Sequence, residues 1–102
     1  MTERNARLRE AILEMNGPYP DMRFLFEYAG ASQGYGPFAL RAVDFARFLT
    51  DMLRVCGARE WAHLKGKPVR VRIDEAGLIA AVGNFVDDDW VAVNDYKAAS
   101  NG

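Results

Sequence analysis

The stretch PVRVRIDEAGLIAAVGNFVDDDWVAV, residues 68–93, decides the fold of this chain. Val69, Val71 and Ile73 alternate with charged residues, and successive strand side chains point to opposite faces. The pattern therefore predicts a strand with one apolar and one charged face. Gly77 can take the positive φ that a tight reversal needs, so a hairpin turn is expected around it. The whole stretch predicts a β-meander, with strands at 68–73, 78–85 and 90–93 and a second reversal at Asp87–Asp89.

The strongest helical pattern lies upstream, at Ala42–Cys56. Apolar residues recur there at spacings of three and four and make a broad face, while Asp and Arg alternate along the other face. Gly57 follows, and glycine commonly ends a helix in the left-handed conformation. A helix with so wide an apolar face suits one face of a sheet. Its apolar residues are Ala42, Phe45, Ala46, Phe48, Leu49, Met52, Leu53 and Cys56.

The first 17 residues carry a weaker pattern of helical type. Leu8, Ala11, Ile12 and Met15 form a narrow apolar stripe at helical spacing. Thr2 suits an N-cap, and Gly17 followed by proline is a common way to end a helix. The sequence therefore predicts a peripheral helix from about Glu3 to Asn16.

Between these two helices the pattern favours β-structure. Met22–Ala29 alternates and is rich in aromatic residues, which predicts a strand. The glycine-rich segment 30–37 predicts a loop or an irregular hairpin, and Phe38–Leu40 a short strand. The spacing of the glycines matches neither a P-loop nor a dinucleotide-binding fingerprint, so turns that need positive φ explain them.

These elements together predict one α+β domain over residues 1–102. The length of 102 residues fits one domain, and half of the residues are hydrophobic, which is enough for a single core. We expect a mostly antiparallel sheet with the Ala42–Cys56 helix packed on one face. Residues 96–102 are expected to fray.

Charge and cysteine content exclude several classes of protein. The net charge is −1, so the chain is neither a polycation nor an acidic mimic of DNA. Cys56 is the single cysteine, which excludes an internal disulfide and suits a reducing compartment. The N-terminus lacks the apolar run of a signal peptide, and no stretch approaches the ~20 apolar residues of a membrane helix. We expect a soluble, cytoplasmic protein that does not engage a membrane.

Two charged groups in the meander are the best candidates for binding a partner. The basic group precedes and enters the first strand, and the acidic group occupies the second reversal beside a tryptophan, a residue type common at interface hot spots. The acidic group alone is expected to be a solvated turn, not a metal site. The candidate residues are Lys65, Lys67, Arg70, Arg72, Asp87, Asp88, Asp89 and Trp90.

Catalytic chemistry finds little support in the residues. His63 is the single histidine, and Cys56 lies on the apolar face of a helix, where a packed thiol is expected. A small hydrolase that uses His63 or the Asp87–Asp89 group remains as an enzymatic alternative. We assign no catalytic, metal or cofactor residues and predict that the chain is not an enzyme.

One set of short motifs recurs in a known group of proteins: Trp61, Leu64-Lys65-Gly66, Val69-Arg70-Val71, Val82-Gly83 and Asp88-x-Trp90. In these motifs the chain resembles small uncharacterised proteins encoded in tailed phages and prophages. The resemblance covers about Phe24 to Val93. Asn84 stands where related chains carry a histidine, so no role of that histidine carries over.

The resemblance implies a phage-encoded accessory protein in the cytoplasm of a bacterial host, and no particular activity. The leading prediction is stoichiometric binding to a host or phage protein, with inhibition of a host defence complex as its sharpest form. The alternative is a nucleic-acid-binding accessory protein that uses the basic residues at 65–72. An exposed sheet edge would also allow a homodimer.

Overall fold

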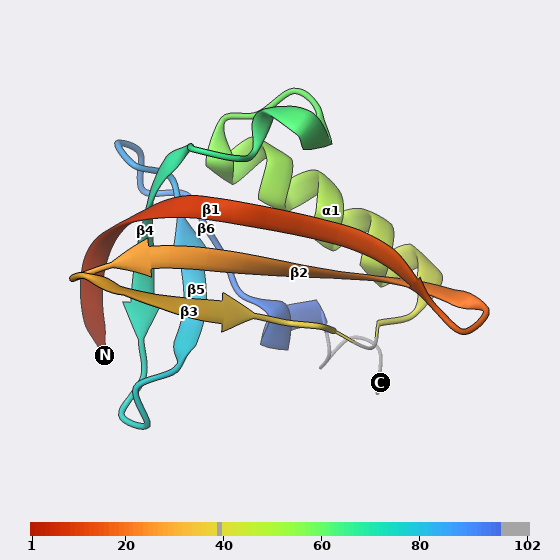
Figure 1. Cartoon of the computed structure of the whole chain (residues 1–102), viewed down its shortest axis with the longest axis horizontal. Helices are drawn as coiled ribbons and strands as arrows, with labels where there is room; N and C mark the ends of the chain where they lie inside the picture. Colours follow the sequence, from red (N-terminus) through yellow and green to blue (C-terminus); the bar gives the residue numbers. More distant parts are fainter. Residues whose placement is uncertain (39, 97–102) are drawn as a thin grey trace.

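The computed structural model describes residues 1–38 and 40–96 and contains one antiparallel sheet of six strands, in the order β3-β2-β1-β4-β5-β6 (Figure 1). One long helix, one turn of 3-10 helix and a short helical segment at 93–96 complete the described part of the α+β fold. The elements are β1 (Thr2–Asn16), β2 (Tyr19–Tyr28), β3 (Ala31–Tyr35), α1 (Ala42–Cys56), η1 (Trp61–His63), β4 (Pro68–Ile73), β5 (Ile79–Gly83) and β6 (Trp90–Val91).

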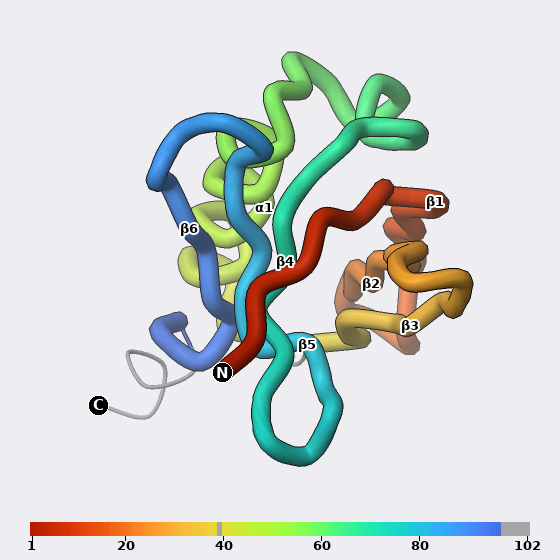
Figure 2. The backbone as a smooth tube through the Cα atoms, turned by 90° about the vertical axis from the view of Figure 1, so that its left-hand side faces the viewer, coloured from red at the N-terminus to blue at the C-terminus, as the bar shows by residue number. Residues whose placement is uncertain are grey.

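The core lies between α1 and the inner face of the sheet, where α1 runs behind β1 and β2 (Figures 1 and 2). Alternation places Val69 and Val71 of β4 on this face, and both are fully buried. Phe48 of α1 packs its ring edge-on against that of Phe24 of β2, with 6.4 Å between centroids. The predicted meander and the predicted helix at Ala42–Cys56 are confirmed, with the second and third strands shorter than expected.

The predicted N-terminal helix is wrong, because residues 2–16 form the long strand β1. The pairing of β1 with β2 shifts register between Leu8 and Glu10, which is a β-bulge around Arg9. Leu8 lies opposite Phe26, and Ala11 lies opposite Phe24, so both face the core across the bulge. The extra residue turns the strand spacing of two into a spacing of three. That spacing imitates one turn of a helix, which explains the error.

Gly17 and Pro18 close a two-residue hairpin between β1 and β2 instead of ending a helix. Gly17 has φ 65°, which a type II′ turn requires at its first central position. Proline tolerates the second position, because its φ is fixed near −65°. A Gly-Pro pair therefore serves a hairpin here as well as it would serve a helix end.

β1 joins two halves of the sheet that run in different directions (Figure 2). Its first half, Thr2–Arg7, pairs with β4, and its second half, from Arg7 to Asn16, pairs with β2. The sheet curls enough for β3 to reach β5. The Gln33 side chain donates to the carbonyl of Gly77 at 2.7 Å and accepts from the amide of Ile79 at 2.8 Å.

Of three smaller predictions, one is confirmed and two are corrected. The glycine-rich segment is the hairpin between β2 and β3, so the second of the two predicted forms holds. Phe38 and Leu40 belong to no strand, and Ala39 lies outside the described residues. Tyr96 does not fray: it is buried, with 8% of its surface exposed, and lies in the helical segment described at 93–96. The rest of the predicted tail, 97–102, lies outside the described residues.

If β1 carries core residues, truncating one of them will be costly. Leu8 is fully buried, and we expect Leu8→Ala to lower the free energy of unfolding by about 2–5 kcal/mol, as for other buried leucines. Leu78→Ala is the matched control, because Leu78 is 58% exposed. Urea denaturation of both variants measures the difference. Equal, small losses would contradict the placement of β1.

Candidate functional site

The outer face of the sheet carries a stack built on Trp90. Arg70 and Arg72 of β4 project to this face, as their alternation predicts, and their guanidinium carbons lie 5.0 and 3.8 Å from the centroid of the Trp90 ring. The ring rests on Gly83, where an added Cβ would come within 2.6 Å of it. The indole Nε1 donates to the carboxylate of Asp88 at 2.9 Å. A flat aromatic platform with cations over it is therefore fixed in place.

Glu3 of β1 reduces the positive charge of this stack. Its carboxylate lies 3.6 Å from Nη1 of Arg70 and 3.5 Å from Nε of Arg72. Such half-exposed pairs contribute little to stability. They do leave the stack without a large excess of positive charge, because one acid is shared by two bases.

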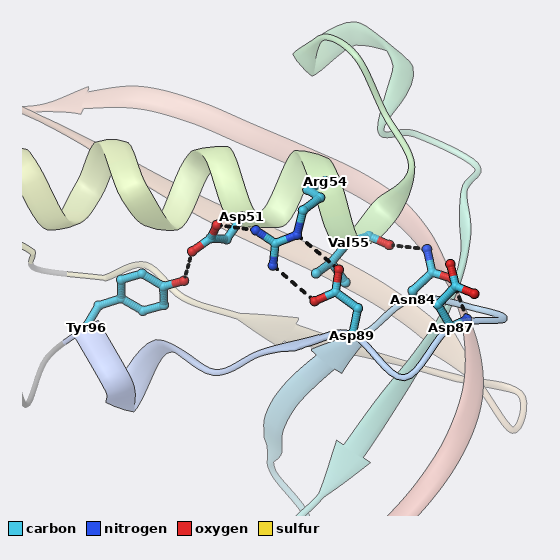
Figure 3. Close-up of polar contacts among 7 residues, drawn as sticks. All are labelled: Asp51, Arg54, Val55, Asn84, Asp87, Asp89 and Tyr96. Atoms are coloured by element: carbon cyan, nitrogen blue, oxygen red, sulfur yellow. Dashed lines mark hydrogen bonds and ion pairs between the residues drawn. The ribbon is translucent and has the colours of Figure 1, made fainter.

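The loop between β5 and β6, residues 84–89, lies beside the stack and is organised by Asn84. The Asn84 side-chain amide donates to the carbonyl of Val55 in α1 at 3.0 Å (Figure 3). Its Oδ1 accepts from the amides of Val86 and Asp87 at 2.9 and 2.8 Å. One side chain therefore fixes the turn and ties it to the end of the helix.

Two arginines hold the β5–β6 loop from either side. Arg70 donates from Nε to the carbonyl of Asn84 at 2.8 Å and from Nη2 to that of Asp87 at 2.7 Å. Arg54 of α1 donates to both carboxylate oxygens of Asp89 at 3.0 and 3.1 Å (Figure 3). This hydrogen bonding from Arg54 lowers the pKa of Asp89 and raises that of Arg54. The loop is thus clamped between helix and sheet.

Arg54 extends the clamp along the helix toward the last described residues. It also pairs with Asp51 one turn earlier, and Asp51 accepts a hydrogen bond from the hydroxyl of Tyr96 (Figure 3). Burial, more than this hydrogen bond, raises the pKa of Tyr96. The helical turn at 93–96 and the β5–β6 loop are therefore fixed to the same helix face.

The clamped loop exposes two apolar side chains next to two exposed acids. Phe85 is 45% exposed and Val86 is 82% exposed, between Asn84 and Asp87. A rigid loop that displays apolar side chains loses little conformational entropy when a partner covers them. The sequence analysis missed both residues. The available signal was an apolar pair inside a polar reversal, where a turn normally carries polar side chains.

The structure separates the predicted basic residues. Arg70 and Arg72 share the Trp90 platform, whereas Lys65 lies in the turn before β4. Lys67 directly precedes β4, and its charge acts on the Cys56 thiol of α1. The four residues do not form one continuous strip.

The three predicted acids diverge. Asp88 bonds the Trp90 indole, Asp89 bonds Arg54, and the described contacts of Asp87 are made by its main chain. Among residues 1–38 and 40–96 there is no group of three or more His, Cys, Asp or Glu side chains placed to hold a metal ion.

The residues of the enzymatic alternative are also apart from any hollow described. His63 is exposed and its Nε2 lies 3.1 Å from a carboxylate oxygen of Glu60. Burial raises the pKa of the Cys56 thiol to about 12, so the thiol stays protonated at neutral pH. Two hollows of about 300 and 250 Å³ lie on either side of Gly34 and Gly36, and neither is lined by His63 or Cys56.

Comparison with known proteins gives no further assignment. No family model matches the chain, and no curated protein or solved structure matches it. In the described part of the chain no helix has the length and apolar character needed to cross a membrane.

If Asn84 organises the β5–β6 loop, its removal will loosen that loop. We expect Asn84→Ala to lower the free energy of unfolding by about 1–3 kcal/mol, because two loop amides and one helix carbonyl lose their partner. The amides of Val86 and Asp87 should then exchange faster with deuterium. Asp87→Ala, which removes an exposed carboxylate, should change stability by less than about 0.5 kcal/mol. Unchanged amide exchange in Asn84→Ala would contradict this role.

The pair of Arg54 and Asp89 predicts a pH dependence. Because the pKa of Asp89 is lowered in the folded state, its contribution exists above the ordinary aspartate pKa of about 4 and disappears as the pH falls through the lowered value. Asp89→Asn should thus cost about 0.2–1 kcal/mol at pH 7, as exposed pairs do, and less at pH 2–3. Denaturation at both pH values, with Asp87→Asn as control, measures it. A cost that does not shrink in acid would contradict the ion pair.

Proposed function

We propose that the chain is a non-enzymatic protein-binding domain that acts by stoichiometric contact through the β5–β6 loop. The observation that carries this proposal is the loop itself. Hydrogen bonds accepted by Asn84 and donated by Arg70 and Arg54 fix its shape, and Phe85 and Val86 are exposed in that shape. Apolar side chains in an ordered segment are normally buried. The exposure of Phe85 and Val86 therefore favours a partner that covers them.

The composition of this face indicates what kind of partner it fits. Trp90, Arg70 and Arg72, residue types common at hot spots, lie together next to the loop that carries the exposed Phe85. Asp87 and Asp88 border the apolar tip. A complementary partner is a protein with an apolar depression for Val86 and Phe85 and basic side chains on its rim, because such a rim faces the two acids.

A nucleic-acid partner is the second candidate, and the described contacts favour it less. Arg70 directs its donors to two carbonyls of its own chain, and Glu3 sits within 3.6 Å of both arginines. A phosphate backbone would have to compete with these contacts and would be repelled by Glu3. Contact with a protein surface does not require these hydrogen bonds and ion pairs to break.

The biological setting proposed here rests on the resemblance to phage and prophage proteins. In that setting the partner is a host or phage protein in the bacterial cytoplasm, and the sharpest form of the proposal is inhibition of a host defence complex. This role requires a tight, stoichiometric contact, which a preorganised loop favours.

A comparison of three immobilised proteins tests the proposal. We expect the native chain to retain one bacterial protein at equimolar yield, and Val86→Asp to weaken that binding at least tenfold, because it would bury an unpaired charge. Leu78→Asp, a matched change at another exposed turn, should bind normally. Calorimetry with the purified partner gives the stoichiometry. Equal binding by Val86→Asp, or DNA binding that weakens steeply with salt, would contradict it.

A further inference from the structure

One stretch of the sheet has an open edge. β1 pairs with β4 only at Thr2–Arg7, so the far half of β1 has β2 on one side and no described strand on the other. The connector around η1 covers part of that side: the Trp61 indole donates to the carbonyl of Ala11 at 3.2 Å. Beyond Ala11, from residue 12 to residue 16, no described strand pairs with this edge.

Two residues direct their main-chain groups outward along this edge. The carbonyl of Ala11 points away from β2, because it accepts a hydrogen bond from the Trp61 indole. Main-chain N–H and C=O groups point to the same side at every second residue of a strand, so those of Leu13 and Met15 also point away from β2. The partner of Met15 in β2 is Pro20, which has no N–H to donate, so this is a pair whose hydrogen-bonding groups face away from each other. Both observations agree that the N–H and C=O of Leu13 and Met15 face outward.

The side chains at the edge are exposed as well. Leu13 is 46% exposed and Met15 64% exposed, on the same face of β1 as Ala11. Glu14 between them lies on the other face, 3.7 Å from Nη2 of Arg23, which offsets its charge. The segment is thus an apolar edge strand without lysine or proline, the kind that pairs with another strand.

The other ends of the sheet are protected. β6 has only two paired residues, and β3 is tied to β5 by the Gln33 side chain. Natural sheets blunt their outermost strands in these ways to avoid pairing with other chains. The contrast marks the edge at residues 12–16 as a surface kept open.

We propose that this edge pairs with the same edge of a second copy, antiparallel about a two-fold axis at Glu14, to form a homodimer. In this register Leu13 lies opposite Met15 of the partner copy, so outward donors meet outward acceptors on both sides of the axis. Apolar side chains meet apolar side chains on one face. On the other face two Glu14 side chains meet, each accompanied by its own Arg23. The edge is therefore complementary to itself.

The dimer would leave the β5–β6 loop uncovered. The β1–β2 hairpin and the β5–β6 loop lie at opposite sides of the molecule (Figure 1). Two copies joined at the hairpins would present two loops, and a bivalent contact strengthens binding to an oligomeric partner. The dimer itself does not depend on what the loop binds.

Sedimentation over a concentration series tests the dimer. We expect the native chain to dimerise, Met15→Lys to raise the dissociation constant at least tenfold by placing a charge opposite Leu13 of the partner copy, and Leu13→Pro to do the same by removing an outward N–H that β2 does not use. Circular dichroism checks that both variants fold. Val86→Asp should dimerise normally, so a failed dimer and a failed loop contact are distinguishable. A native chain that stays monomeric overturns the proposal.

Cysteine crosslinking tests the register. Residue 14 would face its own copy as a non-hydrogen-bonded pair with Cα atoms about 4.5 Å apart, which a disulfide can bridge. Glu14→Cys should therefore form a disulfide dimer under mild oxidation, and Asn16→Cys, the matched control two residues along the strand, should not. The native Cys56 is buried and does not interfere. A disulfide dimer of Asn16→Cys but not of Glu14→Cys overturns the register.

Discussion

The two-sided pairing of β1 is the constraint on which the rest of the structure depends. One strand of 15 residues gives its first half to β4 and its second half to β2, so its pairing joins the meander and the N-terminal hairpins into one sheet. A straight strand could not pair with both β4 and β2, which run in different directions, while both halves of the sheet pack on α1. The bulge at Arg9 supplies the bend and keeps Leu8 and Ala11 on the core side. The same division leaves the far half of β1 with an open edge.

The candidate binding face is a consequence of how the other half of the sheet is fastened to α1. Asn84 reaches the last turn of the helix, Arg54 reaches back to Asp89, and Arg70 closes the loop from the sheet. These polar contacts lie at the rim of the core, where water is close, so each is modest in free energy. Their joint effect is geometric. They hold the loop in a conformation in which Phe85 and Val86 are exposed.

Trp90 shows how a single glycine decides the use of a large side chain. Its ring would clash with any Cβ at position 83, so Gly83 lets it lie flat on the sheet under two guanidinium groups. In the sequence the default interpretation of this tryptophan is a core anchor, and an interface contact is the alternative. Its half-buried position between strand and arginines combines both, because one ring face packs on backbone and the other meets charge.

Much of the fold was readable from local pattern. Strict alternation in β4 and a broad apolar face in α1 determine those elements, because strand and helix periods differ and packing on one face selects between them. The same logic placed Arg70 and Arg72 together. It failed at β1, where one bulged residue changed a period of two into an apparent helical spacing, and Gly-Pro served a hairpin as well as a helix end.

The sequence by itself determined the α+β class, the meander and the helix that covers it, since each rests on neighbours within a few positions. Only the tertiary structure decided which charged groups meet. Arg54 and Asp89 are 35 positions apart, and the sequence contains no signal for their distance. The tertiary structure also decided that Lys67 does not join Arg70 and Arg72, that Phe85 and Val86 are exposed, and that β1 has an open edge. These are properties of strand order and sheet curvature, which arise when distant segments bury a common core.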